Sequence, residues 1–154
     1  MKIFTNVMAG AAAAAVLMTP VAAGAVTARE AEQIRKLDIM LMVTSLRCRT
    51  GKDDFQPHYR KFSSAHLATL NSAARTLEGG LVKRHGQKGA KRALDRISVG
   101  MANQYGQGHP WLECGQLKEI THDLSQSRDS SELHLAADEL LGSGPKHGGR
   151  FAIR

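Results

Sequence analysis

The chain has 154 residues, of which 42% are hydrophobic, 23% charged and 5% aromatic. This length holds one ordinary domain, which excludes a cofactor domain beside a separate substrate domain. The 21 lysines and arginines outnumber the 14 aspartates and glutamates, so the formal net charge is +7. That balance excludes an acidic solvating tail and favours anionic neighbours.

The N-terminus has the layout of a secretory signal peptide. A positive start at Lys2 precedes an alanine-rich apolar run over residues 7–21, and the small residues Ala-Gly-Ala follow at 23–25. A membrane anchor is the alternative, but a span needs about 20 strongly apolar residues, and this run is shorter. The sequence therefore predicts a signal peptide, residues 1–25, and an exported mature chain, residues 26–154, that is periplasmic or secreted and has no membrane span.

Export gives the two cysteines, Cys48 and Cys114, a specific meaning. Disulfides persist in oxidising compartments and are rare in the cytosol, and two cysteines allow one intramolecular bridge. We expect this disulfide, with a pair of buried free thiols as the alternative. The chain has no C-x-x-C or C-x-x-C-H motif, so the cysteines indicate neither a metal site nor covalent haem.

The first predicted helix begins at the capping box Thr27-Ala28-Arg29-Glu30, in which the Thr27 hydroxyl and the Glu30 carboxylate each satisfy a free backbone amide. Gly51 is placed to end this helix. Apolar residues recur in it at three- and four-residue intervals and predict a wide buried stripe: Ile34, Leu37, Met40, Leu41, Val43 and Leu46.

A long second helix is predicted after Asp54, a plausible N-cap, with Pro57 tolerated in its first turn. The pair Gly79-Gly80 is expected to kink or end it. One face carries apolar residues and a histidine at helical spacing: Phe55, Tyr59, Phe62, His66, Leu70, Ala73, Leu77 and Leu81.

Residues 83–89 form a basic, glycine-rich stretch that we interpret as a connection, followed by a third helix over residues 90–105. Pro110 is a favoured first helical residue and predicts the start of a fourth helix. Its apolar ridge continues through Leu112, Leu117, Ile120 and Leu124.

A second capping-box pattern at residues 129–132 predicts a short fifth helix, which Gly142 ends. The tail, residues 143–154, is rich in glycine and basic residues and is expected to be disordered. No segment alternates apolar and polar residues as a strand does. We therefore predict an all-α domain, residues 26–142, that packs as a bundle of four to five helices linked by one disulfide.

None of the seven histidines has a second histidine four residues away, as in the H-E-x-x-H pattern of a helical metal site, so no metal site is predicted. His66 lies on an apolar stripe, where a hydrogen-bonded core histidine is the expected role. A haem or copper site that combines His66 with Met40 or Met101 is the alternative.

Hydrolytic chemistry has weak support. His122-Asp123 matches a dipeptide found in secreted phospholipases, but neighbouring residues on a helix do not face each other, so a solvated surface is expected there. The serines Ser63, Ser64 and Ser98 lack the G-x-S-x-G context of a nucleophile. An acid and a base could be brought together only by folding.

The stretch from Tyr105 to Trp111 places two aromatic residues, His109 and two glycines close to Cys114. Binding residues are often found on loops that a rigid scaffold holds, which makes Tyr105, His109 and Trp111 a candidate binding loop. The alternative is that Tyr105 and Trp111 simply cover the end of the bundle.

The strongest charge cluster lies between residues 83 and 96, where Asp95 is the single acidic residue. We expect this surface to face anions such as lipopolysaccharide, anionic lipid headgroups or nucleic acid, with a merely solvated helix face as the alternative. No aromatic residue in the stretch could stack on bases. The cations are Lys83, Arg84, Lys88, Lys91, Arg92 and Arg96.

Three stretches carry a resemblance to known proteins: LDIMLMVTSLRCR at 37–49, RALDRIS at 92–98 and YGQGHPWLEC at 105–114. They resemble a group of small exported helical proteins of Gram-negative bacteria that sometimes carry the name S-adenosyl-L-homocysteine hydrolase. The resemblance implies export and a helical fold. The name implies an NAD-dependent enzyme, whose G-x-G-x-x-G fingerprint the chain does not contain, so no catalytic residue is carried over.

These observations favour a non-enzymatic binding or envelope-associated protein with a basic, anion-facing surface and no cofactor. The alternatives are a small secreted hydrolase and a metal or haem carrier. The sequence indicates no oligomeric state.

Overall fold

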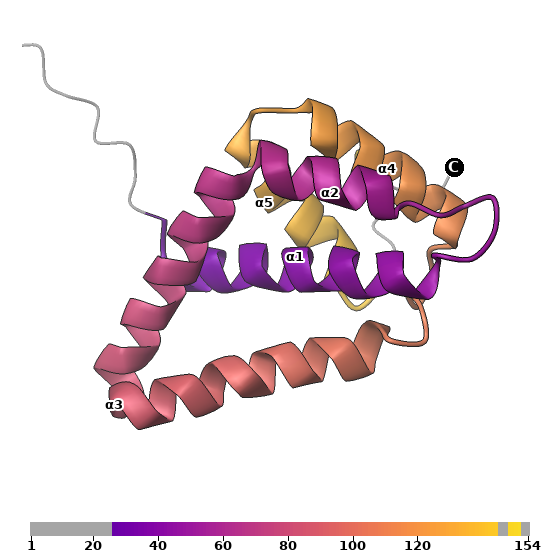
Figure 1. The fold of residues 1–154 in the computed structure, drawn as a ribbon. Helices are drawn as coiled ribbons and strands as arrows, with labels where there is room; N and C mark the ends of the chain where they lie inside the picture. The colour runs from indigo at the N-terminus through magenta and orange to yellow at the C-terminus, as the bar shows by residue number, and fades with distance from the viewer. Residues whose placement is uncertain (1–25, 145–147, 152–154) are drawn as a thin grey trace, which may run out of the picture.

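The computed structural model describes residues 26–144 and 148–151, and this part of the chain is all-α, as predicted (Figure 1). The predicted signal peptide, residues 1–25, lies outside the described residues. Five helices follow in chain order: α1 (Ala28–Arg47), α2 (Gln56–Ala65), α3 (Leu67–Tyr105), α4 (Cys114–Gln126) and α5 (Ser130–Leu140).

Helix α1 begins at the predicted capping box. The backbone N–H of Glu30 donates to Thr27 Oγ1 at 3.2 Å, and the N–H of Thr27 donates to Glu30 Oε2 at 2.7 Å. The predicted stripe is buried except for Val43, which is half-buried, and Leu46 in the last turn, which is 47% exposed. Because the buried face of a helix advances by 3.6 residues per turn, Thr44 and Cys48 occupy it there and Leu46 does not.

The prediction of one long second helix is wrong, because the chain forms two helices, α2 and α3, that meet at His66. The backbone of His66 has φ −107° and ψ 14°, and its N–H still donates to Phe62 O at 3.0 Å. Its ring Nε2 lies 2.7 Å from the carbonyl oxygen of Leu124 on α4. We attribute the break to this contact, which fixes the histidine against a distant helix. Pro57 lies in the first turn of α2, as expected.

The predicted connection over residues 83–89 is also wrong, because α3 continues through it. The chain changes direction at Gly86 alone, with φ 65° and ψ 173°, a left-handed conformation that glycine adopts at little cost. Gly79 and Gly80 remain helical. Figure 1 shows the result: a first arm, residues 67–85, meets a second arm, residues 87–105, at a sharp corner.

Helix α1 lies at the centre and packs against α3, α5 and α2, while α2 packs against α4 (Figure 1). The second arm of α3 runs alongside α1 on the side away from α2. One continuous apolar core results, and its largest fully buried side chains from the other helices and loops include Phe55, Phe62, Leu77, Leu117, Leu124, Leu133 and Leu140.

Helix α4 begins at Cys114, later than the start predicted at Pro110. The backbone N–H of Glu113 donates to the side-chain oxygen of Gln116 at 2.9 Å, so these two residues form the helix start. Pro110 is exposed in the preceding loop. Leu112 is still buried, as its place in the predicted ridge required.

Asp129 caps the start of helix α5, and its Oδ1 accepts the N–H of Ser131 at 2.8 Å. The Glu132 side chain of the predicted capping box instead pairs with Arg150. The predicted tail, residues 143–154, is described in part. There, the N–H groups of Arg150 and Phe151 donate to the Glu139 carboxylate at 3.1 and 2.8 Å.

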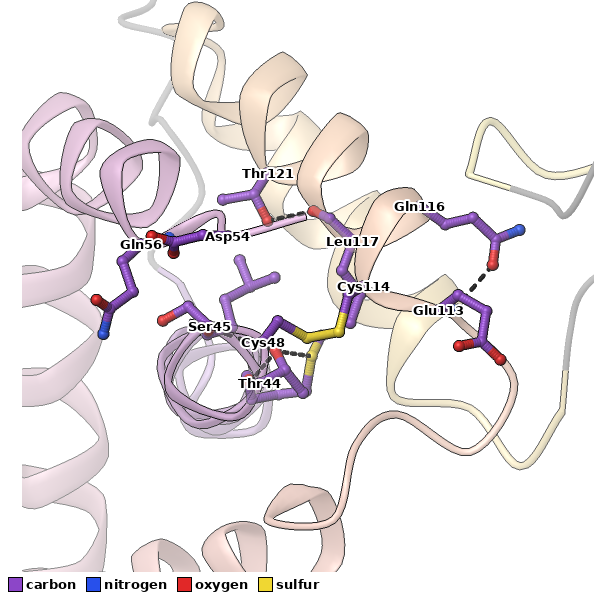
Figure 2. The surroundings of a disulfide bond; sticks show 12 residues. Thr44, Ser45, Cys48, Asp54, Gln56, Glu113, Cys114, Gln116, Leu117 and Thr121 are labelled. Atoms are coloured by element: carbon purple, nitrogen blue, oxygen red, sulfur yellow. Dashed lines mark hydrogen bonds between the residues drawn. A yellow bond between two sulfur atoms is a disulfide. The ribbon is translucent and has the colours of Figure 1, made fainter. Parts of the chain in front are cut away.

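The predicted disulfide is present between Cys48 and Cys114, whose Cα atoms are 5.7 Å apart (Figure 2). It joins the residue that ends α1 to the first residue of α4. The polar residues around it are satisfied within their own helices, because Thr44 Oγ1 donates to Met40 O at 2.7 Å and Thr121 Oγ1 donates to Leu117 O at 2.6 Å. Across the described residues, no helix combines the length and the apolar character that a membrane crossing needs.

Candidate functional site

The predicted cationic surface gathers around the corner of α3. We call this set the basic elbow: Lys83, Arg84, Lys88, Lys91, Arg92 and Arg96. All six side chains are exposed, and within the described residues none forms a salt bridge. In Figure 1 the corner projects away from the rest of the bundle. The elbow therefore lies on an exposed, projecting part of α3, and its last member, Arg96, lies further along the second arm, where it also lines a groove beside α1.

Small residues on the inner side allow this corner to form. Leu81, Ala90 and Ala93 are buried on the inner face of the two arms, so the lysines and arginines between them face outward. Gly89 lies so close to His85 that a Cβ atom at position 89 would be 2.6 Å from the His85 Cβ. Gly86 supplies the turn and Gly89 the close approach, which explains why the basic stretch contains two glycines.

The charge of the elbow is not balanced locally. Six cations face one acidic residue, Asp95, over residues 83–96, which leaves a local excess of five. Exposed charges act over about 8 Å at physiological salt, so the six reinforce one another at a surface that approaches the corner. Such a cluster attracts phosphate-rich partners and its attraction weakens with salt.

The loop from Tyr105 to Trp111 has a structural role in the fold. Tyr105 is only 1% exposed, and its ring lies 5.4 Å from that of His109. The His109 ring is 4.6 Å from the Trp111 ring, and its Nε2 lies 3.0 Å from the carbonyl of Leu140. These contacts connect the end of α3 to the end of α5. They support the alternative that the aromatic residues cover the end of the bundle.

Burial lowers the pKa of His109, because the apolar surroundings disfavour the charged ring. Its Nε2 contacts the Leu140 carbonyl, and its Nδ1 lies 3.5 Å from the N–H of Trp111. The neutral ring that donates from Nε2 and accepts at Nδ1 satisfies both contacts. A proton added at Nδ1 would point at the Trp111 N–H, so the ring could no longer accept from it.

This pKa predicts that the fold weakens in mild acid. The unfolded histidine titrates near pH 6.5, so below that pH the unfolded chain binds a proton that the folded chain excludes. The stabilisation is complete above pH 6.5 and is lost as the pH falls toward the lower folded pKa. Urea unfolding should show a loss on the order of 1 kcal/mol between pH 7.5 and 5.5. His109→Gln, which keeps a donor and an acceptor, should lose less, and an equal loss in both proteins would contradict this role.

A pair of histidines that the sequence did not reveal lies between α2 and α4. The rings of His58 and His122 are 5.1 Å apart, edge to face, and His58 Nδ1 is buried without a hydrogen-bond partner among the residues that the structure describes. Burial and the neighbouring charges of His122 and Lys118 lower the pKa of His58. The two residues are 64 positions apart (122 − 58), which is why no sequence motif indicated them.

The predicted interpretation of His122-Asp123 as solvated helix surface agrees with the structure. The two side chains are 50% and 68% exposed, and His122 Nδ1 lies 3.3 Å from Asp123 Oδ1. The nearby hydroxyl of Ser125 donates to the His122 carbonyl at 2.6 Å, so it is not directed at the imidazole. Ser125 is therefore not placed as a nucleophile for this pair.

The residues considered for a metal or haem site are used by the core. His66 is buried against Leu124, and Met40 and Met101 are buried as well. Among the residues that the structure describes, no three His, Cys, Asp or Glu side chains come close enough to hold a metal ion.

A buried polar contact links α1 to α2. The Tyr59 hydroxyl donates to Asp38 Oδ1 at 3.0 Å, and Arg35 donates to Asp38 Oδ2 at 3.0 Å. Burial raises the pKa of the Asp38 carboxyl, and burial beside that carboxylate raises the pKa of Tyr59. Each acceptor oxygen has a donor, so we assign this contact to the packing of the two helices.

The basic elbow is thus the sequence-predicted site whose side chains remain exposed and unpaired within the described part of the chain. The disulfide and the aromatic loop are part of the framework behind it. Comparison with known proteins found that no family model, no curated protein and no solved structure matches the chain.

Proposed function

We propose that this is an exported, non-enzymatic protein that binds phosphate-rich anionic surfaces of the cell envelope through its basic elbow. The phosphate groups that the elbow would bind are those of lipopolysaccharide and of anionic lipid headgroups. The signal-peptide pattern, the disulfide and the resemblance to small exported helical proteins support the location. The exposed positive charge of the elbow supports a phosphate-rich partner.

The observation that carries the proposal is the exposure of six cations at the projecting corner of α3 and along its second arm, with no salt bridge to any of them in the described structure. A convex corner can contact a flat array of phosphates without a change in fold. Nucleic acid would satisfy the same charges, but the segment lacks aromatic residues for stacking on bases. We therefore favour the envelope surface.

A triple variant, Lys88→Gln, Lys91→Gln and Arg92→Gln, should bind anionic vesicles roughly a hundredfold more weakly than the natural chain. Each lysine or arginine close to such a surface contributes about 1 kcal/mol, and this variant removes three of them. Vesicle co-sedimentation across a salt series measures the effect, and the loss should shrink as salt rises.

A matched control removes three exposed arginines elsewhere, through Arg47→Gln, Arg49→Gln and Arg60→Gln. It has the same net charge as the triple variant and should bind more tightly than that variant. Equal binding by the two would show that net charge, and not the elbow, is responsible. Tighter binding to DNA than to vesicles at equal salt would favour nucleic acid as the partner.

Export is tested separately. Protein recovered from the periplasm or the medium should begin at or near Val26, because cleavage is expected after Ala25. N-terminal sequencing or intact mass measures the start. A mature protein that begins at Met1 would contradict export by signal-peptide cleavage.

A further inference from the structure

A groove of about 470 Å³ lies between the second arm of α3, the middle of α1 and the end of α5. Four of its lining residues are apolar and form what we call its floor, three from α3 and one from the residue that follows α5: Ala93, Ile97, Met101 and Leu141. Lys36 and Arg96 line it as cations, and none of its lining residues in the described part of the chain is an aspartate or glutamate. Its volume falls in the range of small-molecule sites. We call it the α3 groove.

One residue of the groove has no explanation in packing. Gly100 is an exposed glycine inside a helix, which costs about 1 kcal/mol relative to alanine. A Cβ atom at Gly100 would meet nothing within 4 Å, whereas one at Gly89 or Gly106 would meet an atom at 2.6 Å. The fold does not need this glycine for close approach. Its effect is to leave the groove open where a side chain would enter it.

The charges around the groove suit a single anionic group. Lys36 Nζ is 2.7 Å from Glu32 Oε1 in the neighbouring turn of α1, so this pair is neutral together. Arg96 forms no salt bridge within the described residues. One net positive charge therefore remains beside the apolar floor.

The floor has the length of a medium acyl chain. From Ala93 to Met101 the helix advances about 12 Å, at 1.5 Å per residue. Tyr105 bounds the groove one helical turn further along. A straight apolar chain with one anionic end fits this combination of length, apolar floor and single cation.

We propose that the α3 groove binds one anionic, single-chain amphiphile, with its acyl chain along the apolar floor and its carboxylate or phosphate at Arg96 and Lys36. This site goes beyond the proposed function, since the elbow attracts a surface through charge alone whereas the groove takes up one molecule. A free fatty acid and a lysophospholipid share this chemistry, because each has one acyl chain and an anionic end.

The test uses sodium dodecanoate below its micelle concentration, with titration calorimetry on the disulfide-bonded mature chain. The natural chain should bind one molecule. Gly100→Leu, which fills the groove without changing charge, should bind at least tenfold more weakly. Gly79→Leu is the matched control, because Gly79 is also an exposed helical glycine with no atom within 4 Å of its Cβ position, and it should bind as the natural chain does.

The headgroup is tested with Arg96→Gln. This variant should weaken dodecanoate binding several-fold and leave binding of dodecyl maltoside, which has the same chain and a neutral head, unchanged. Competition with monomeric lysophosphatidylglycerol separates the two sources: a lower dissociation constant than that of dodecanoate assigns the site to a lysophospholipid, and a higher one, or failure to displace dodecanoate, assigns it to a free fatty acid.

No saturable binding of dodecanoate by the natural chain would overturn the proposal, as would equal binding by Gly100→Leu in a protein whose circular dichroism is unchanged. Gly100→Leu retains every cation of the elbow, so its vesicle binding through the elbow should persist. Loss of dodecanoate binding by Gly100→Leu with intact vesicle binding supports the groove independently of the elbow. Loss of vesicle binding by the Lys88, Lys91 and Arg92 triple variant with intact dodecanoate binding supports the elbow independently of the groove. Arg96 belongs to both sites, so Arg96→Gln is not used for this distinction.

Discussion

Replacing both Cys48 and Cys114 by alanine should lower the free energy of unfolding by about 4 kcal/mol. The disulfide joins residues 66 positions apart, and closing a loop of this length removes that much conformational entropy from the unfolded chain. Urea unfolding followed by circular dichroism measures the difference. This is a large share of the stability of an ordinary domain, so the variant should be partly unfolded at elevated temperature.

Reduction provides the control for this result. Dithiothreitol should lower the stability of the natural chain by a similar amount and leave the double alanine variant unaffected. The same urea midpoint for the oxidised and reduced natural chain would show that the link between α1 and α4 contributes nothing to stability.

Tyr105→Ala should cost about 3 kcal/mol of unfolding free energy, because truncation of a fully buried aromatic side chain leaves a cavity. Tyr105 is the largest of the fully buried side chains and lies where α3 ends. Trp111→Ala, at a half-buried position of the same loop, should cost clearly less. Thermal or urea unfolding of the two variants measures both effects.

The same two variants decide between the two interpretations of the aromatic loop. If Tyr105 and Trp111 cover the end of the bundle, both variants lose stability and keep their binding to anionic vesicles at a temperature at which they are folded. A Tyr105→Ala protein that is as stable as the natural chain but no longer binds vesicles would instead make this loop the binding surface.

Features set by neighbouring residues could be predicted from the sequence. The capping box of Thr27 and Glu30 depends on residues three positions apart, and the structure contains it as expected. The exposure of the elbow cations follows from the buried alanines between them. The disulfide followed from there being two cysteines in a chain that we expected to be exported.

Features set by distant contacts could not be predicted. His66 has the spacing of a continuous helix, and its contact with Leu124, 58 positions away, accompanies the break between α2 and α3. Gly86 alone turns a helix in which the glycine-rich sequence indicated a longer connection. The late start of α4 at Cys114 depends on the Glu113 and Gln116 pair, whereas Pro110 gave the stronger local signal.

The candidate sites follow the same division. The six cations of the elbow lie within 14 consecutive residues, 83–96, so the sequence indicated them. The α3 groove combines Lys36, Arg96 and Leu141 from three parts of the chain, and only the fold brings them together. Gly100 is one of five glycines in α3, so the sequence did not single it out.

The disulfide also determines what proteolysis can release. The elbow, including the exposed residues 83–88, lies between Cys48 and Cys114 in the chain, so the bridge closes a covalent ring that contains it. A protease that cuts one bond within this ring produces a nick and no separate fragment. The two arms of α3 then remain parts of one molecule until the disulfide is reduced, so release of the exposed elbow requires both cleavage of the chain and reduction of the bridge.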